Sequence, residues 1–324
     1  MRRILAWTLL IASACTAGAR VTEASSCDKA CLERIGDLYV KAYVNRDPSA
    51  APIASDVRFV ENNVEMLRFP DASWDTVTEE VGEALILSDP RTGHVGIFTS
   101  IMQNDVPGFL AIRLKVADDE IAEIEHILST RRNLSGPPTP IGDVREYEHD
   151  PVLNEIVPVD ERVSRERLIA HAHGYFDTLE NNTGEIRGTR FSPDAKRFEN
   201  GLEFERIEEG FKSGRYRFNN RVRDRDVFLV DEERQIAVAR AYIDHKGVLD
   251  EYTLTDGSKQ RSVFREPHTW SLFEGFKVKD DRIVSVIATF IGAPYYIRSP
   301  FITDPDPVYD THQGEARPKR EGGR

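Results

Sequence analysis

The sequence predicts an α+β protein built from two similar domains in tandem. ASDVRFVENNVEM at 54–66 is echoed by FSPDAKRFENGLEF at 191–204, with acidic, basic and Glu-Asn positions shared at an offset of 138 residues. LKVADDEIAEIEHIL at 114–128 matches FKVKDDRIVSVIATF at 276–290 at an offset of 162 residues. An amphipathic helical pattern precedes the first echo in both halves. Repeats of this size indicate that one domain occurs twice in the chain.

The first domain is expected over residues 27–130. Cys27–Asn45 has apolar residues at helical spacing, and Asp47-Pro48 ends that helix. A strand is predicted at Val57–Val60, and Thr76–Leu87 is predicted to form a second, short helix. Both Glu61-Asn62 here and its echo Glu199-Asn200 are expected where a strand begins. Three strands of a meander follow, at His94–Met102, Phe109–Val116 and Ile121–Leu128.

Residues 131–163 are predicted to be a Pro-rich linker, because Gly136-Pro137-Pro138-Thr139-Pro140 favours an extended chain. The second domain, residues 164–298, begins with a helix that Ser164 caps and that runs to about Asn181. Its strands are expected at Lys196–Phe198, Val227–Val230, Ile236–Ile243, His268–Val278 and Ile283–Phe290. An insertion at Asp244–Pro267 has no counterpart in the first domain. Residues 299–324 lack an apolar period and are predicted to be disordered.

Composition and charge limit the classes of partner. The chain has 324 residues, of which 40% are hydrophobic and 30% charged, as is usual for a soluble globular protein. Its net charge of −12 argues against nucleic acid or an anionic membrane as a partner. No segment beyond the N-terminus is apolar for long enough to span a bilayer.

The N-terminus has the pattern of a signal peptide. Arg2 and Arg3 precede the apolar run Ile4–Ile11, and small residues follow at Ala12–Ala19. We therefore expect residues 1–24 to be a signal peptide and the mature protein to be secreted or periplasmic. The cleavage position stays open, as does the alternative that Cys15 carries a lipid.

Cys27 and Cys31 are predicted to form a disulfide. Their i,i+4 spacing at the start of a helix places the Cα atoms within disulfide range, and an exported compartment favours oxidation. Redox or metal chemistry is the alternative. Two cysteines without neighbouring histidines make a poor metal site, so we favour a structural staple.

The second domain resembles the nuclear transport factor 2-like superfamily, the group of SnoaL-like polyketide cyclases, scytalone dehydratase and ketosteroid isomerase. The resemblance rests on YFDTLENNTG at 175–184, SPDAKRFENG at 192–201 and the closing strands. It implies two tandem cone-shaped domains, each a curved, mostly antiparallel sheet wrapped around N-terminal helices, with a cavity that binds small apolar or aromatic molecules. It also implies either a monomer that acts as a pseudo-dimer or a homo-oligomer.

Several residues of the second domain are candidates for catalysis. Glu199 beside Asn200 could be a general base and its ligand-binding neighbour, or the pair could simply form a turn. His171 and Tyr175 lie on one helical stripe that could face a cavity. Asp177 lies off that stripe, but the superfamily often has a catalytic acid near this helix end.

Alternation along two strands gives the other candidates. Arg240 and Tyr242 share one strand face and could anchor a ligand, or Arg240 could pair with Glu251 or Asp226. His268 and Trp270 share a face with Leu272 and Glu274, which could place an acid–base group beside an aromatic wall. We expect His268 to be the leading catalytic residue. His126 in the first domain is interpreted as a hydrogen-bonded core histidine.

Absent motifs and these candidates together predict the type of function. The sequence contains no GxGxxG, P-loop, GxSxG or HExxH run, and its histidines lack metal-ligand spacing, so we expect no cofactor and no metal. We therefore predict an exported, cofactor-free acid–base enzyme, a lyase, dehydratase or isomerase. Its substrate is expected to be a small aromatic or polycyclic molecule. The alternative is a non-catalytic binding or interaction module of the same fold.

Overall fold

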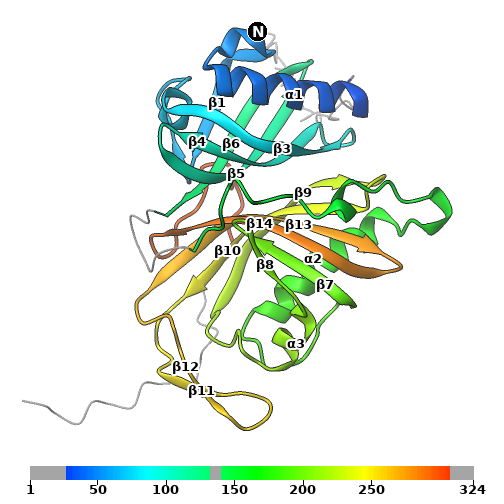
Figure 1. Ribbon diagram of the computed structural model, residues 1–324, viewed down its shortest axis with the longest axis vertical. Helices are drawn as coiled ribbons and strands as arrows, with labels where there is room; N and C mark the ends of the chain where they lie inside the picture. The colour runs from blue at the N-terminus through cyan, green and yellow to red at the C-terminus, as the bar shows by residue number, and fades with distance from the viewer. Residues whose placement is uncertain (1–26, 132–139, 307–324) are drawn as a thin grey trace, which may run out of the picture.

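A computed structural model describes residues 27–131 and 140–306 and contains two six-stranded mixed sheets (Figure 1). The strand orders are β2-β1-β6-β5-β4-β3 and β8-β7-β14-β13-β10-β9. In the first sheet β1 runs parallel to β6, in the second β7 runs parallel to β14, and the other neighbours are antiparallel. The two sheets share order and strand directions, which suggests two domains.

The first sheet and its helix form the N-terminal half, residues 27–131. Helix α1 (Lys29–Asn45) begins where the Asp28 side chain accepts a hydrogen bond from the Cys31 amide at 2.9 Å. Short 3-10 turns η1 (Pro48–Ala50) and η2 (Ala72–Asp75) flank the first strands. The strands are β1 (Ile53–Glu61), β2 (Val64–Glu65), β3 (Val77–Asp89), β4 (His94–Gln103), β5 (Val106–Ala117) and β6 (Glu120–Thr130).

The prediction of a helix at Thr76–Leu87 is wrong, because this segment forms β3. The buried residues Val77, Val81 and Leu85 are four positions apart, which resembles a helical stripe. Four is also a multiple of the two-residue alternation of a strand, so the same three residues share one face of β3. The pairing of β3 with β4 shifts between Val81 and Leu85, where Gly82 has a φ of 79°.

The second sheet, two helices and the preceding segment form the C-terminal half, residues 140–306. Ser164 caps α2 (Arg165–Leu179), accepting from the Arg167 amide at 3.2 Å, and α3 (Ile207–Lys212) is short. The sheet strands are β7 (Phe191–Glu199), β8 (Leu202–Phe204), β9 (Arg221–Asp231), β10 (Ile236–His245), β13 (His268–Lys279) and β14 (Arg282–Ala293). None of the helices in residues 27–131 and 140–306 is long and apolar enough to cross a membrane.

Two predicted irregular segments contain local structure. The segment expected to be a linker carries the 3-10 turns η3 (Pro151–Asn154) and η4 (Val159–Glu161), and Leu153 is fully buried. The predicted insertion contains the hairpin β11 (Glu251–Thr253) and β12 (Lys259–Arg261). In Figure 1 this hairpin projects beyond the second sheet.

The two Glu-Asn motifs end strands rather than begin them, which corrects the sequence interpretation. Glu61 and Glu199 are the last residues of β1 and β7. Asn62 and Asn200 follow with φ values of 50° and 47°, in the left-handed region that Asn tolerates in turns. Each turn leads directly into a short antiparallel strand, β2 or β8.

The two sheets face each other across a shared apolar core. In Figure 1 helix α1 lies above the first sheet, and α2 and α3 lie beneath the second. Leu87, Phe98 and Ile127 of the first sheet belong to one buried cluster with Phe228, Val238 and Phe273 of the second. This core holds the halves together through the hydrophobic effect.

Charged groups are also buried between the halves. Glu125 of β6 is fully buried and accepts hydrogen bonds from Arg113 at 3.0 Å and from Arg240 of the other half at 2.6 Å. Ser299 also donates to Glu125, and the Phe301 ring lies under Arg113, 4.5 Å from its guanidinium carbon. Ser299 and Phe301, at the start of the predicted disordered tail, therefore contact the N-terminal half. The rest of that segment lies outside the described residues.

Candidate active site

A cavity of about 240 Å³ lies in the C-terminal half, between α2, the turn after α3 and the inner face of the second sheet. Its walls are mainly apolar and aromatic. The exposed side chains of Phe204 and Val263, the latter from the insertion, are part of its lining and mark its solvent side. The lining residues are Tyr175, Leu179, Arg197, Glu199, Phe204, Arg215, Tyr216, Phe218, Asn219, Ile243, Gln260, Val263, Trp270, Leu272, Glu274, Ala288 and Phe290.

A buried arginine organises the polar wall of this cavity. Arg197 lies on β7, and its Nε is 2.8 Å from Oε1 of Glu199 two residues further along the strand. Its two terminal nitrogens donate to the hydroxyls of Tyr175 at 3.2 Å and Tyr216 at 3.0 Å. One guanidinium thus fixes a carboxylate and two phenols, which come from a strand, a helix and a turn.

Glu274 on β13 is the most perturbed acid of the cavity. Its side chain is buried, and that burial raises its pKa from 4.5 to about 8. Arg197 opposes the shift and the charge of Glu199 adds to it. A carboxyl group with this pKa keeps its proton at neutral pH and can donate it. The cavity therefore contains a protonated acid, Glu274, and a second carboxyl group, that of Glu199.

Three of the predicted site residues line the cavity: Tyr175, Glu199 and Trp270. Alternation along β13 places Trp270, Leu272 and Glu274 on the cavity side, as the sequence pattern indicated.

Two predicted catalytic residues of α2 lie elsewhere. His171 is held by Thr189 at 2.8 Å and by Asp281 at 3.0 Å. Asp177 lies at the surface, where it pairs with Arg225.

The remaining predicted residues also lie outside the cavity lining. Arg240 pairs with Asp226 at 2.9 Å and with Glu125, and the Tyr242 hydroxyl donates to Asn63 at 3.0 Å, so both face the N-terminal half. Asn200 is fully buried in its turn, where its side chain bonds to both backbone groups of Phe290. His268 stacks on His245, with ring centroids 4.4 Å apart.

The sequence analysis placed Glu274 on the same strand face as His268 and Trp270 but did not select it as a site residue, and it did not consider Arg197, Tyr216 or Asn219. Glu274 had a usable signal, since it shares the alternation of Trp270 and Leu272. Arg197 lies inside the repeated motif, between the conspicuous Asp194 and Glu199. Tyr216 and Asn219 belong to a basic segment without a period, so only the folded chain reveals their position.

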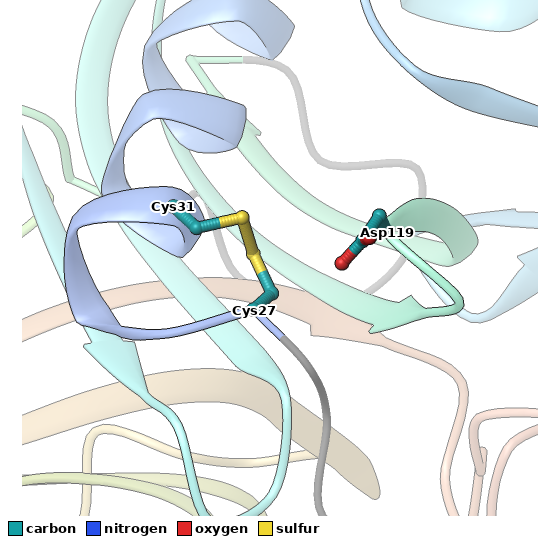
Figure 2. Close-up of side chains that lie close together, drawn as sticks. All are labelled: Cys27, Cys31 and Asp119. Atoms are coloured by element: carbon teal, nitrogen blue, oxygen red, sulfur yellow. A yellow bond between two sulfur atoms is a disulfide. The ribbon is translucent and has the colours of Figure 1, made fainter.

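The predicted disulfide between Cys27 and Cys31 is confirmed, with Cα atoms 5.2 Å apart. Figure 2 shows the two sulfurs joined and the carboxylate of Asp119 beside them. These three side chains have the proximity of a metal-binding group. Because each sulfur is bonded to the other, neither cysteine offers a thiolate to a metal.

Part of the C-terminal half matches a known family of domains. Residues 161–290 match a family described as "Domain of unknown function (DUF8021)". No curated protein matches. A solved structure named "putative ketosteroid isomerase" from Kribbella flavida DSM 17836 is 15% identical, with 38% of this chain and 91% of that chain covered and a TM-score of 0.25. An uncharacterized protein with a cystatin-like fold from Caulobacter vibrioides is 13% identical, with 39% and 88% covered and a TM-score of 0.24. Similarities at these TM-scores carry no argument about this chain.

Proposed function

We propose that the C-terminal half is a cofactor-free acid–base enzyme, an isomerase, dehydratase or other lyase, acting on a small ring compound in the cavity. The observation that carries this proposal is Glu274, a buried carboxyl group with a pKa raised to about 8 in a mainly apolar cavity. Burial of an ionisable group without full pairing is costly for the fold. Perturbed acids in cavities are typical of sites that transfer protons.

The size of the cavity narrows the substrate class. Pockets for drug-sized ligands measure about 300–1,000 Å³. The cavity here, about 240 Å³, is smaller. It suits a compound of one or two rings better than a larger polycyclic molecule. Trp270, Phe218 and Phe290 supply aromatic surface for such a compound.

The two carboxyl groups support different roles. Glu199, oriented by Arg197, would take a proton from a carbon of the substrate, and Glu274 would give its proton to an oxygen. In a dehydration that oxygen leaves as water. In an isomerisation it is a carbonyl oxygen: Glu199 then returns its proton to a different carbon, and Glu274 recovers its own proton from the enol. Proton transfer by one positioned group contributes about 10²–10⁴-fold in rate.

A non-catalytic binding module is the second candidate. One observation favours it: both terminal nitrogens of Arg197 donate to protein hydroxyls, those of Tyr175 and Tyr216. An arginine engaged in this way can form part of the wall around an apolar ligand without taking part in proton transfer.

Substitution of the two acids, with a matched control, tests the enzyme proposal. Purified protein is incubated with aromatic alcohols, enones and hydroxyketones of one or two rings, and products are detected by mass spectrometry and NMR. Glu274→Gln and Glu199→Gln should each lower turnover about 10²–10⁴-fold while ligand affinity is largely kept. Glu203→Gln is the control, because Glu203 is exposed on β8, pairs with Lys196 and does not line the cavity. Unchanged ligand recovered from a tight complex would favour the binding module instead.

We also propose that the halves are two tandem cone-shaped domains of the nuclear transport factor 2-like type, at residues 27–130 and 164–298. The shared strand order and the apolar core between the sheets support this, and the first domain would then replace the dimer partner. Sedimentation analysis should find a monomer.

Export to an oxidising compartment is a separate proposal. The Cys27–Cys31 disulfide supports it, since disulfides persist in such compartments. The predicted signal peptide lies outside the described residues. N-terminal sequencing of the mature protein should start after residue 14, 19 or 24, and an intact Met1 would contradict export.

A further inference from the structure

His245 is buried beside the cavity in an aromatic environment. It ends β10, and its ring is surrounded by Phe264 at 4.2 Å, His268 at 4.4 Å and Trp270 at 4.6 Å between centroids. It is fully buried, and its Nδ1 has no hydrogen-bond partner. Its Nε2 makes a single bond, at 2.8 Å, to Oδ1 of Asn219.

The buried His245 ring, with its unpartnered Nδ1, lowers the stability of the fold relative to a phenylalanine at the same position. A buried polar atom without a partner costs about 1–3 kcal/mol, and an imidazole in an aromatic box gains little that a benzene ring does not. In one tautomer of His245 the unpartnered Nδ1 carries only a lone pair, and in the other it carries an N–H. A buried lone pair without a partner costs less than a buried N–H without one, so Nε2 carries the proton and donates to Asn219. The only polar contribution of this ring is therefore to fix the Asn219 side chain.

Asn219 itself lines the cavity and is otherwise rigid. Its backbone amide donates to Tyr216 at 3.0 Å and its carbonyl accepts from Asn181 at 2.8 Å. His245 already donates to Oδ1, so we take the amide nitrogen of Asn219 as the end that a molecule in the cavity uses. An amide nitrogen donates to a carbonyl or other acceptor oxygen.

We propose that Asn219, held by the positioning residue His245, binds an acceptor oxygen of the ligand at the end of the cavity opposite Arg197 and Glu199. The inference rests on the proposed use of this cavity and defines its ligand further. In the sheet order, β7 with Arg197 and Glu199 is separated by β14 and β13 from β10 with His245. The Asn219 side chain is thus held from the β10 side of the sheet, whereas Arg197 and Glu199 belong to the β7 side. The ligand class is a one- or two-ring compound with a carbonyl oxygen remote from its reacting carbon.

A pair of probes of equal size tests the hydrogen bond separately from packing. The bicyclic ketone 1-tetralone carries one carbonyl oxygen, and the hydrocarbon tetralin carries none. Calorimetric titration of the whole protein gives the ratio of their dissociation constants. In the wild type the ketone should bind roughly three- to tenfold more tightly, as one neutral hydrogen bond provides. Asn219→Leu should bring that ratio to about one.

His245→Phe keeps the aromatic packing and removes the hydrogen bond to Asn219, so it should also bring the ratio close to one. His245→Gln, which can again donate to Asn219, should restore most of it. His268→Phe is the matched control: it lies in the same stack, its Nδ1 contacts only the Glu266 carbonyl, and the ratio should stay at the wild-type value.

Each outcome discriminates between the two proposals. A wild-type ratio in His245→Phe, or equal weakening of both probes, would overturn the positioning role while the proposed enzyme stands. If the ratio of dissociation constants changes as expected but the protein forms no product, the role of Asn219 in binding is supported and the proposed enzyme function is rejected. Failure of both probes to bind the wild type would overturn both proposals.

Discussion

The two halves of this chain share a strand order but differ in what fills the space between helix and sheet. The registers identify equivalent positions: His126 lies opposite Glu61 and Ile112 in the first sheet, and Ala288 lies opposite Glu199 and Glu274 in the second. The position of His126 in the first half is thus occupied by Ala288 in the second. Likewise, the position of Ile112 in the first half is occupied by the acid Glu274 in the second.

The helices differ in the same sense. The buried residues of α1 and α2 correspond at an offset of 136 residues, which pairs Tyr39 with Tyr175 and Tyr43 with Leu179. In the N-terminal half the rings of Tyr43 and His126 are in contact, with centroids 5.3 Å apart. In the C-terminal half both equivalents, Leu179 and Ala288, line the cavity. Two rings of the N-terminal half are therefore replaced by smaller side chains at the cavity wall.

The polar groups follow this difference. In the N-terminal half, His126 is enclosed, with Nε2 2.8 Å from the Tyr39 hydroxyl and Nδ1 3.4 Å from Glu61. In the C-terminal half, the equivalent glutamate, Glu199, pairs with Arg197 instead of a histidine, and a second acid, Glu274, lines the cavity. The same scaffold thus supports a packed core in one half and a candidate reaction site in the other.

Refilling the cavity should have the largest effect. The double variant Leu179→Tyr with Ala288→His restores both rings and should abolish binding of one- and two-ring ligands, because the rings occupy their space. Calorimetric titration measures the loss, and an unchanged thermal unfolding profile shows that the fold is kept. Retained ligand affinity would show that the ligand binds outside this cavity.

Emptying the N-terminal half is the reverse experiment. Tyr43→Leu or His126→Ala should lower the free energy of unfolding by about 2–5 kcal/mol, as large-to-small core substitutions do. Leu179→Ala is the comparison, and it should cost less because that leucine already faces a cavity. Chemical denaturation measures all three. Equal costs in both halves would contradict the difference in packing.

The third prediction concerns pH and Glu274. The folded protein keeps this proton up to about pH 8, whereas the unfolded chain releases it above about pH 4.5. Between those values the folded state binds more protons, so stability falls as pH rises, by about 1.4 kcal/mol per pH unit. Glu274→Gln removes this term. Its unfolding free energy should therefore exceed that of the wild type increasingly from pH 5 to pH 8, and parallel curves would contradict the raised pKa.

Much of the fold could be predicted from the sequence because it depends on local patterns. Apolar periods and caps predicted both long helices, and alternation predicted most strands. Val77, Val81 and Leu85 made β3 resemble a helix, since a four-residue spacing fits one face of a helix as well as one face of a strand. The internal repeat predicted two similar halves before any contact was known.

The candidate site was harder to predict because it depends on which strand face meets which neighbour. The sequence analysis expected the face of β10 with Arg240 and Tyr242 to anchor a ligand, but that face packs against the N-terminal half. The cavity lies on the opposite face of β10, where Ile243 is part of the lining. Glu274 differs from the exposed glutamates through its burial beside the cavity, which is a property of the folded chain.

The smallest effect is expected from the Cys27–Cys31 disulfide. It closes a loop of only a few residues, for which the chain-entropy model gives about 2 kcal/mol or less. The start of α1 is also held by ion pairs to the C-terminal half, from Lys29 to Asp231 at 2.7 Å and from Glu33 to Arg234 at 2.7 Å. These remain when the disulfide is lost. Cys27→Ser with Cys31→Ser should therefore reduce the unfolding free energy slightly and leave ligand affinity unchanged. Denaturation and titration of the same sample measure both, and weaker binding would show that the N-terminal staple supports the cavity across the sheet interface.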